Sequence, residues 1–188
     1  DANTERRELL LGQRPPRFDS SFDEAIALTG DDFERVALKA ESARDYFLLV
    51  GPPGTGKTSR ALRRMVEHFY AASSMQILLL AYTNRAVDEI CQSLSSITPC
   101  IDYIRVGSEL SCDVRFRGHL LENILAECNS RREVNIRMAD CRVYVGTVAS
   151  IAAKAELFKL KRFDVAIVDE ATQILEPQLL GILCAKFA

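Results

Sequence analysis

The stretch that decides the fold reads Gly51-Pro52-Pro53-Gly54-Thr55-Gly56-Lys57-Thr58. It has the form G-x-x-x-x-G-K-[ST], in which glycines let backbone N–H groups curl around the phosphates of a nucleotide. The pattern assigns Lys57 to the outer phosphates and the Thr58 hydroxyl to Mg²⁺. An apolar run at 46–50 predicts a strand before the loop, and helical spacing from Ala61 predicts a helix after it. The order of strand, glycine loop and helix favours a phosphate-binding loop formed by Gly51–Thr58 over a Gly-Pro turn beside a surface lysine.

A second apolar run, at 163–168, ends in two carboxylates, Asp169 and Glu170. Strands of a parallel sheet read as continuous apolar runs, and ligands bind beyond their carboxyl ends. We therefore expect Asp169 to hold Mg²⁺ together with Thr58, directly or through water. Neighbouring strand residues point to opposite faces, so Glu170 suits another task, orienting and deprotonating a water that attacks the γ-phosphate. The alternative is that the acidic pair only caps the next helix.

Strand-type runs alternate with helical patterns along the chain, which predicts an α/β fold with a central parallel sheet between two helical layers. The runs are at 46–50, 76–81, 101–106, 142–145 and 163–168. Helical spacing covers 22–43, and another helix is expected from Asn84. A polar, largely helical stretch at about 111–139 interrupts the alternation as an insertion. The first segment, 1–20, has the composition of a linker or packing arm.

Composition narrows the classes of protein and partner. The 188 residues fit one domain, with 48% hydrophobic and 27% charged residues and a net charge of −2. A nucleic-acid surface must then be a local patch. One candidate is a cationic face on the insertion, formed by Arg115, Arg117, Arg131, Arg132 and Arg137. The alternative is a solvated surface balanced by Glu122, Glu127 and Glu133. The apolar runs are too short to span a membrane, and the scattered cysteines favour reduced thiols in the cytoplasm, or in the nucleus of a eukaryote.

Taken together, four segments resemble the first RecA-like half of superfamily 1 helicases. The similarity is to the 5′-to-3′ branch, which includes nonsense-mediated-decay RNA helicases and replication helicase–nucleases. The segments are Gly51–Thr58, Leu79–Asp88 as motif Ia, Val145–Ser150 as motif Ic, and Val168–Gln173 as motif II, which Glu176-Pro177 follows. The Asp-Glu-Ala-Thr-Gln form of motif II is specific to this branch. The resemblance runs from about Phe33 to the C-terminus and implies a three-layer, RecA-like ATP-binding domain over 21–188.

The resemblance also implies ligands. The nucleotide is ATP with Mg²⁺, and Gln173 senses the γ-phosphate or its attacking water, unless it is a surface glutamine. Thr83, Asn84 and Thr147 touch the backbone of single-stranded DNA or RNA, since hydroxyl and amide groups can bind phosphate oxygens without reading bases. Their alternative role is helix capping. The family reads adenine with a glutamine upstream of the loop; 28–34 contains none, so we expect tolerance of other purines.

These features favour the ATP-binding lobe of an ATP-dependent helicase or translocase. The catalytic set is Lys57, Asp169, Glu170 and Gln173. The chain lacks an initial Met and ends one helix after motif II, so we expect a fragment of a longer protein whose second RecA-like lobe supplies arginine fingers worth about 10³–10⁵ in turnover. By itself it should hydrolyse ATP very slowly. The alternatives are a nucleotide-dependent switch or adaptor and a small-molecule kinase; the Asp169–Gln173 strand end argues against the kinase.

Overall fold

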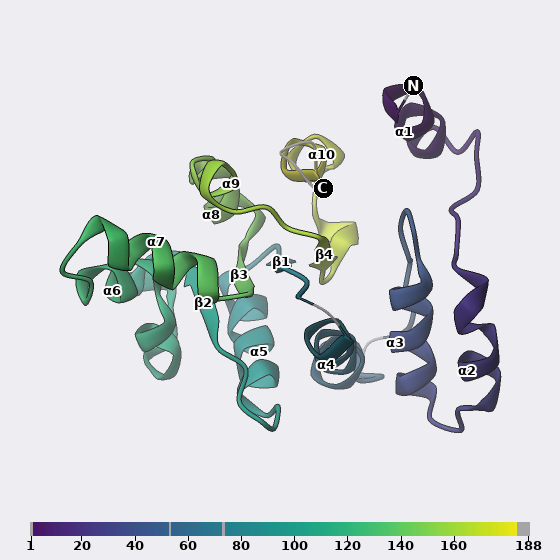
Figure 1. The fold of residues 1–188 in the computed structure, drawn as a ribbon, viewed down its shortest axis with the longest axis horizontal. Helices are drawn as coiled ribbons and strands as arrows, with labels where there is room; N and C mark the ends of the chain where they lie inside the picture. The colour runs from purple at the N-terminus through teal and green to yellow at the C-terminus, as the bar shows by residue number, and fades with distance from the viewer. Residues whose placement is uncertain (1, 53, 73, 184–188) are drawn as a thin grey trace. The chain divides into compact units, whose positions relative to one another are not determined.

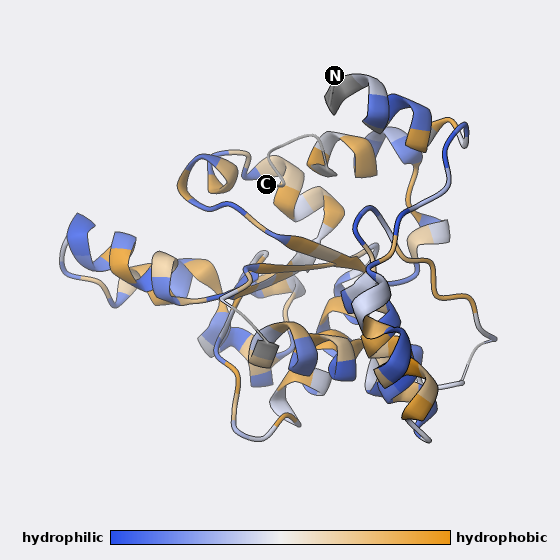
Figure 2. Cartoon of the chain, turned by 45° about the vertical axis from the view of Figure 1, so that its right-hand side comes forward, coloured by the Kyte–Doolittle hydropathy of each residue, from blue (hydrophilic) through white to orange (hydrophobic). Residues whose placement is uncertain are grey.

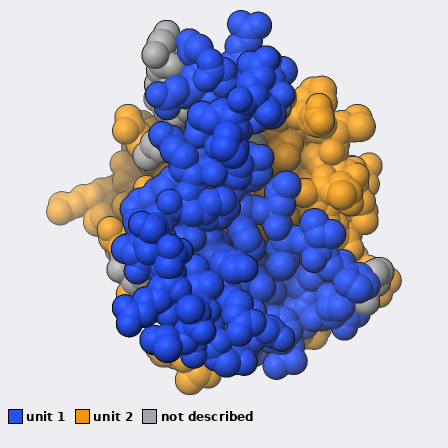
Figure 3. Space-filling view, turned by 90° about the vertical axis from the view of Figure 1, so that its right-hand side faces the viewer, with its two compact units in different colours: residues 1–68 blue, residues 69–188 orange. Residues whose placement is uncertain are grey.

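The computed structural model describes residues 2–52, 54–72 and 74–183. The chain divides into two compact units, Asp1–His68 and Phe69–Ala188, which Figure 3 colours separately. No helix within the described ranges is both long and apolar enough to cross a membrane.

Unit 1 is helical. It contains α1 (Ala2–Leu10), a 3₁₀ turn (Ser20–Phe22), α2 (Asp23–Leu28), α3 (Asp32–Ser42), a π-helix (Lys57–Leu62) and the first part of α4 (Arg63–Ala72). The prediction of one helix over 22–43 is wrong, because the helical structure is interrupted between α2 and α3. Asp31 causes the break: its Oδ1 accepts a hydrogen bond from the Phe33 amide at 2.8 Å, which starts a new helix.

Within unit 1, a buried carboxylate holds the N-terminal segment in place. Asp45 accepts hydrogen bonds from Arg14 Nη1 at 3.0 Å and from the Arg17 amide at 2.9 Å. Hydrogen bonds from the Arg14 and Arg17 side chains keep the pKa of Asp45 well below its usual range. These bonds attach 14–17 to the residue that precedes the apolar run at 46–50.

The strand predicted at 46–50 is not formed. The run has no regular secondary structure; Leu48 is 73% and Val50 91% exposed, whereas Phe47 and Leu49 are half-buried. A strand exists only where its backbone N–H and C=O groups pair with a neighbour, and an apolar pattern by itself supplies no neighbour.

Unit 2 is built on a parallel sheet, as predicted. In the described part of the chain the sheet has four strands rather than five: β1 (Ile77–Ala81), β2 (Tyr103–Val106), β3 (Val143–Thr147) and β4 (Val165–Val168). Their order is β2-β3-β1-β4, so β4 is an edge strand (Figure 1). The side chains of β1 and β3 are buried, whereas those of β4 are half-buried, which matches an edge position.

Helices cover both faces of this sheet. They are α5 (Asn84–Ser95), α6 (Leu121–Ala126), α7 (Arg131–Asp140), α8 (Val148–Ala153), α9 (Leu157–Leu160) and α10 (Glu176–Leu183). Leu78 and Leu80 join a hydrophobic cluster with side chains of α6 to α10. Strand residues alternate between faces, so Ile77 and Leu79 face the other side, where α5 packs on β1 and β3. Figure 2 shows the hydrophobic strands between these helical layers.

The stretch at 111–139 is helical and packs on the core. After 3₁₀ turns at Glu109–Ser111 and Val114–His119, its helices α6 and α7 place Leu121, Ile124 and Met138 in the same cluster as the sheet. The buried ammonium of Lys161 fastens α7 to the segment that leads into β4, donating to Met138 O at 2.9 Å, Ala139 O at 2.8 Å and Cys141 O at 2.5 Å. Burial lowers the pKa of Lys161, and the three carbonyls at the helix end stabilise its charge.

Candidate functional site

The glycine loop of unit 1 turns at two of its glycines. Gly54 and Gly56 have φ values of 80° and 82°, a left-handed conformation that favours glycine. The π-helix begins directly after Gly56, whose carbonyl accepts from the amides of both Arg60 and Ala61 at 2.9 Å. Pro53, a predicted member of the site, lies outside the described residues. The loop therefore leads into a helix N-terminus, as an anion-binding loop requires.

The cation of this loop lies against the loop itself. Lys57 Nζ donates to Gly51 O at 2.5 Å and to Pro52 O at 2.8 Å, and Thr55 Oγ1 donates to Pro52 O at 2.8 Å. Lys57 and Thr58 are half-buried in the first turn after the loop. The Lys57 ammonium, which we expect to bind the outer phosphates, therefore already lies at the loop.

Sequence reasoning missed a contact beside the loop. The Arg60 guanidinium lies over the ring of Phe33, 4.2 Å from its centroid, and joins the π-helix to α3. Phe33 lies within 28–34, the region that lacks the adenine-reading glutamine expected from the resemblance. An arginine at i+4 from a glycine and a distant phenylalanine carry no joint pattern, so only the fold reveals the pair.

In unit 2 the predicted residues gather at one edge of the sheet. Ala81, the last residue of β1, is paired with Thr147, the last of β3. The Asp169 amide donates to Leu80 O at 2.8 Å, so the motif II carboxylates follow β4 at the same edge. Segments far apart in the sequence therefore bring Thr83, Thr147 and Asp169 to the carboxyl end of one sheet, where α/β proteins bind ligands.

The threonines at this edge cap helices. Thr83 Oγ1 accepts from the Ala86 amide at 3.1 Å, which starts α5 just before Asn84. Thr147 Oγ1 accepts from the Ser150 amide at 3.0 Å and donates to Ser150 Oγ at 2.8 Å. The capping alternative is therefore realised for both threonines. Thr83 is exposed and Asn84 half-exposed, whereas Thr147 is buried, so Thr83 and Asn84 are the more accessible pair.

Glycine is required next to Thr147. A Cβ on Gly146 would lie 2.8 Å from the backbone carbonyl oxygen of Val106 on the neighbouring strand. The Gly-Thr pair of motif Ic thus has a packing reason at Gly146 and a capping reason at Thr147.

Motif II has a strained backbone at its second carboxylate. Glu170 has φ 50° and ψ 42°, a left-handed conformation that is uncommon outside glycine and is often found at functional positions. Gln173 Nε2 donates to Glu170 Oε2 at 2.7 Å, and the Glu170 amide donates to Asp169 Oδ1 at 3.1 Å. Glu170 makes no side-chain cap to the short 3₁₀ turn Ala171–Gln173. This geometry does not support capping as the task of Glu170.

The arginines of the insertion are mostly engaged by neighbours. Arg115 bonds to Asp113 at 2.9 Å and Arg117 to Glu109 at 2.7 Å, and Arg137 pairs with Asp102. These pairs favour a charge-balanced surface over a cationic face, but the balancing carboxylates differ from the expected Glu122, Glu127 and Glu133.

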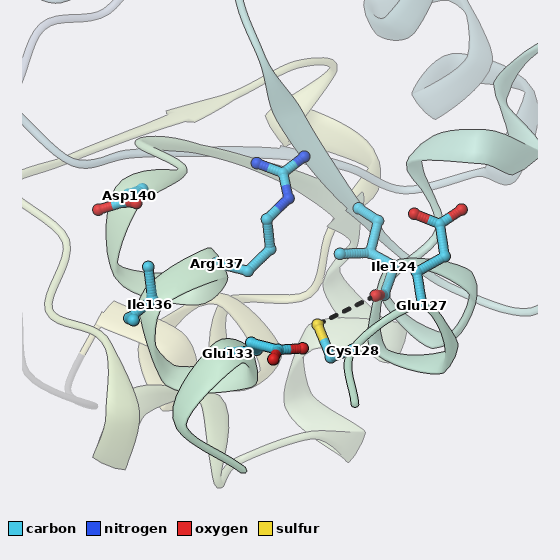
Figure 4. A pocket seen from close by; sticks show the side chains of 7 residues that line it. All are labelled: Ile124, Glu127, Cys128, Glu133, Ile136, Arg137 and Asp140. Carbon is cyan, nitrogen blue, oxygen red and sulfur yellow. Dashed lines mark hydrogen bonds between the residues drawn. The ribbon is translucent and has the colours of Figure 1, made fainter. Parts of the chain in front are cut away.

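A shallow pocket of about 340 Å³ lies between α6 and α7 (Figure 4). Its lining residues are Ile124, Glu127, Cys128, Glu133, Ile136, Arg137 and Asp140. In Figure 4 the Cys128 thiol bonds back to Ile124 O, at 3.5 Å. None of the residues predicted to bind the nucleotide lines this pocket. Its acidic side chains outnumber its one arginine, so it is unsuited to a nucleoside triphosphate.

Residues 34–185 match the AAA domain family. Because this match covers most of the chain, the chain belongs to that family. Its geometry of glycine loop, parallel sheet and motif II turn agrees with that assignment.

Several similar proteins are named as ATP-dependent helicases. The chain is 32% identical over 187 residues to the DNA replication ATP-dependent helicase/nuclease JHS1 of Arabidopsis thaliana, covering 94% of this chain and 13% of the relative. It is 29% identical to the helicase/nuclease DNA2 of Bos taurus, covering 97% and 18%. The putative ATP-dependent RNA helicase ECM32 of Saccharomyces cerevisiae is 28% identical, covering 92% and 18%. The predicted resemblance to the first RecA-like half of 5′-to-3′ superfamily 1 helicases is confirmed, and the chain spans less than a fifth of these relatives' length.

Proposed function

We propose that this chain is the lobe of an ATP-dependent helicase or translocase that binds Mg·ATP and a single strand. The observation that carries the proposal is the shared carboxyl end of the sheet, where Thr147 ends β3, Thr83 follows β1, and Asp169 and Glu170 follow β4. The relatives that match nearly the whole chain are named as ATP-dependent helicases, which supports the same activity for the full-length parent.

For the nucleotide, we propose that the amides of the glycine loop and Lys57 bind the phosphates. Mg²⁺ would be held by Thr58 and Asp169, both of which offer the oxygen ligands that this ion prefers. Bound Mg²⁺ would neutralise charge that develops on the phosphates. Glu170 would orient and deprotonate the attacking water. Gln173 would hold the Glu170 carboxylate through its hydrogen bond and would sense the γ-phosphate or its attacking water.

For the strand, we propose contacts with phosphate oxygens through Thr83, Asn84 and Thr147. Thr147 would have to exchange the hydrogen bond that it now donates to Ser150 Oγ for one to a phosphate oxygen. The Thr83 Oγ1 lone pair is used by the Ala86 amide, but a hydroxyl also carries a donor proton, which can bind a phosphate oxygen. DNA is the first strand to test because JHS1 and DNA2 are named as DNA replication proteins. RNA is the second, after the name of ECM32. If the source is eukaryotic, we propose a nuclear location for the full-length parent.

The chain should bind single strands weakly and without sequence preference. Its net charge is −2, so it can neutralise few phosphates, and each contributes a salt slope of only about −0.7 on a single strand. Fluorescence anisotropy with labelled oligonucleotides of different sequence, at low and moderate salt, measures the affinity for each sequence and its dependence on salt. Thr83→Val should weaken binding because it removes the donor proton, whereas Thr98→Val, on a different loop, should not.

Two results would contradict this part of the proposal. A tight complex at high salt or a strong base preference would instead indicate a dedicated reader elsewhere on the chain, with the 111–139 stretch as the first place to look. In the full-length parent, ATPase activity that a single strand does not stimulate would favour the nucleotide-dependent switch over the translocase.

A further inference from the structure

The pocket between α6 and α7 has no part in the proposed function. None of the residues proposed to bind the nucleotide, the metal or the strand lines its volume of about 340 Å³. Both helices belong to unit 2, so the pocket lies within one compact unit. Its chemistry therefore needs an explanation of its own.

The walls of the pocket include an isoleucine that the core does not use. Val134 and Met138 of α7 pack in the hydrophobic cluster of unit 2, as does Ile124 of α6. Ile136 lies two residues from both Val134 and Met138, about 200° around the helix, and is 49% exposed. The core therefore does not require an isoleucine at this position. Together with Ile124 and the Cys128 thiol, Ile136 gives the pocket an apolar surface.

The rim of the pocket is acidic, and its one arginine is already paired. Arg137 donates to both carboxylate oxygens of Asp102, at 3.3 Å to Oδ1. Glu133 accepts a hydrogen bond from the Asn129 amide at 2.7 Å, which leaves its negative charge without a cation. The charge that remains at the rim is therefore negative.

Two further carboxylates are free to bind a cation. Glu127 of α6 and Asp140 of α7 are exposed, and neither side chain makes a hydrogen bond or ion pair within the part of the chain that the structure describes. The buried Lys161 ammonium acts on Asp140 electrostatically, but three backbone carbonyls occupy it. Figure 4 shows the Glu127 and Asp140 carboxylates on opposite sides of the pocket. Negative charge thus stands on both sides of an apolar surface.

We propose that this pocket docks a basic segment of a partner protein, in which an apolar side chain stands between two lysines or arginines. The apolar side chain would pack against Ile124 and Ile136, and the cations would lie at Glu127 and Asp140. Complementary charge favours such a partner and disfavours others. The same carboxylates would repel the phosphates of a nucleic acid, so a protein segment fits this pocket better than a strand does. The inference goes beyond the proposed function and does not depend on it.

The alternative is a solvated surface on which the isoleucine and the carboxylates have no joint task, since singly exposed apolar residues are normal. The two readings differ in what they require of a ligand. Docking requires both the apolar side chain and the cations. A solvated acidic surface attracts cations whether or not an apolar side chain lies between them.

The test titrates this chain with blocked nonapeptides and follows its backbone amides by NMR. Each peptide consists of alanine, a central leucine and one lysine on either side, at spacings of two, three or four residues. At low salt, at least one spacing should shift the amides of Glu127, Cys128 and Ile136 until they saturate. Replacing the leucine by serine should weaken binding about 10-fold, the lower end for burying one leucine. Replacing the lysines by glutamate should abolish it.

Variants of the chain locate the two kinds of contact. An exposed ion pair contributes about 1.4- to 5-fold in affinity, so Glu127→Gln/Asp140→Asn should bind the lysine peptide about 2- to 25-fold more weakly, with a smaller difference at high salt. Ile136→Ser should remove the advantage of leucine over serine. Glu156→Gln/Glu176→Gln is the matched control, because it removes the same charge from exposed positions of unit 2 outside the pocket and should bind as the unaltered chain does. Unchanged amides away from the pocket report that each variant is folded.

Several results would overturn the inference. They are an absence of shifts in α6 and α7, equal binding of the leucine and serine peptides, and unweakened binding by Glu127→Gln/Asp140→Asn. An oligonucleotide that shifts the amides of α6 and α7 would assign the pocket to the strand instead. Self-association of the chain that Glu127→Gln/Asp140→Asn abolishes would assign it to a second copy. Mg·ATP and strand affinities are measured separately, so the proposed function stands or falls on its own.

Discussion

Lys57→Ala is expected to reduce Mg·ATP binding below detection in calorimetry. The ammonium at the loop can donate to the outer phosphates the hydrogen bonds that it now donates to Gly51 O and Pro52 O. Two hydrogen bonds to a charged group contribute about 3–6 kcal/mol, or roughly 10²–10⁴-fold in affinity. The variant also leaves Gly51 O and Pro52 O without their cation.

Lys39→Ala is the control for Lys57→Ala. Lys39 is an exposed lysine of α3 in the same unit, so its removal changes the net charge equally without touching the loop. Its Mg·ATP affinity should equal that of the unaltered chain. An unchanged affinity in Lys57→Ala would sink the assignment of the glycine loop as the phosphate site.

Glu170→Gln should preserve nucleotide affinity and lower kcat of the full-length parent by about 10²–10⁴-fold, the usual contribution of a general base. The amide has the shape of the carboxylate, so the strained turn and the neighbouring Gln173 can remain in place, but it cannot take a proton from water. Steady-state hydrolysis with saturating single strand measures kcat, and calorimetry measures the affinity.

Glu176→Gln provides the comparison for Glu170→Gln. Glu176 is exposed at the start of α10, a few residues after motif II, and it has no proposed part in hydrolysis. Turnover should be unchanged by this substitution. Normal turnover in Glu170→Gln would show that the catalytic base is elsewhere.

The sheet was predictable where an apolar run also finds partners within unit 2. The runs at 76–81, 101–106 and 163–168 became β1, β2 and β4, because a short continuous apolar run bounded by polar residues suits a strand buried among others. The run at 46–50 has the same composition and forms no strand. Pairing is a property of two segments, and the sequence of one segment cannot supply it.

Helix boundaries depended on single side chains. The apolar spacing over 22–43 is continuous, yet Asp31 offers its carboxylate to the Phe33 amide and begins a second helix. Asn84 was predicted at the start of its helix, and the helix begins there because Thr83 provides the cap. A capping residue inside an apolar pattern is visible in the sequence, but whether it ends a helix depends on packing.

The site was predictable as a set of residue types and not as a geometry. The motifs identify Thr83, Thr147 and Asp169, and parallel strands explain why they share an edge. The left-handed backbone of Glu170 and its bond from Gln173 appear only in the structure, because a non-glycine residue in that conformation has no sequence signature.

We propose that Thr58 and Asp169 hold one magnesium ion on bound ATP. A double-mutant cycle on Mg·ATP affinity, with Thr58→Ala, Asp169→Asn and the double variant, tests it most directly. If both side chains serve the same ion, each single variant should weaken binding, and the double variant should lose much less than the sum of the two losses. In EDTA, where no magnesium is available, neither substitution should weaken ATP binding. Strictly additive losses, or equal losses with and without magnesium, would contradict a shared metal site.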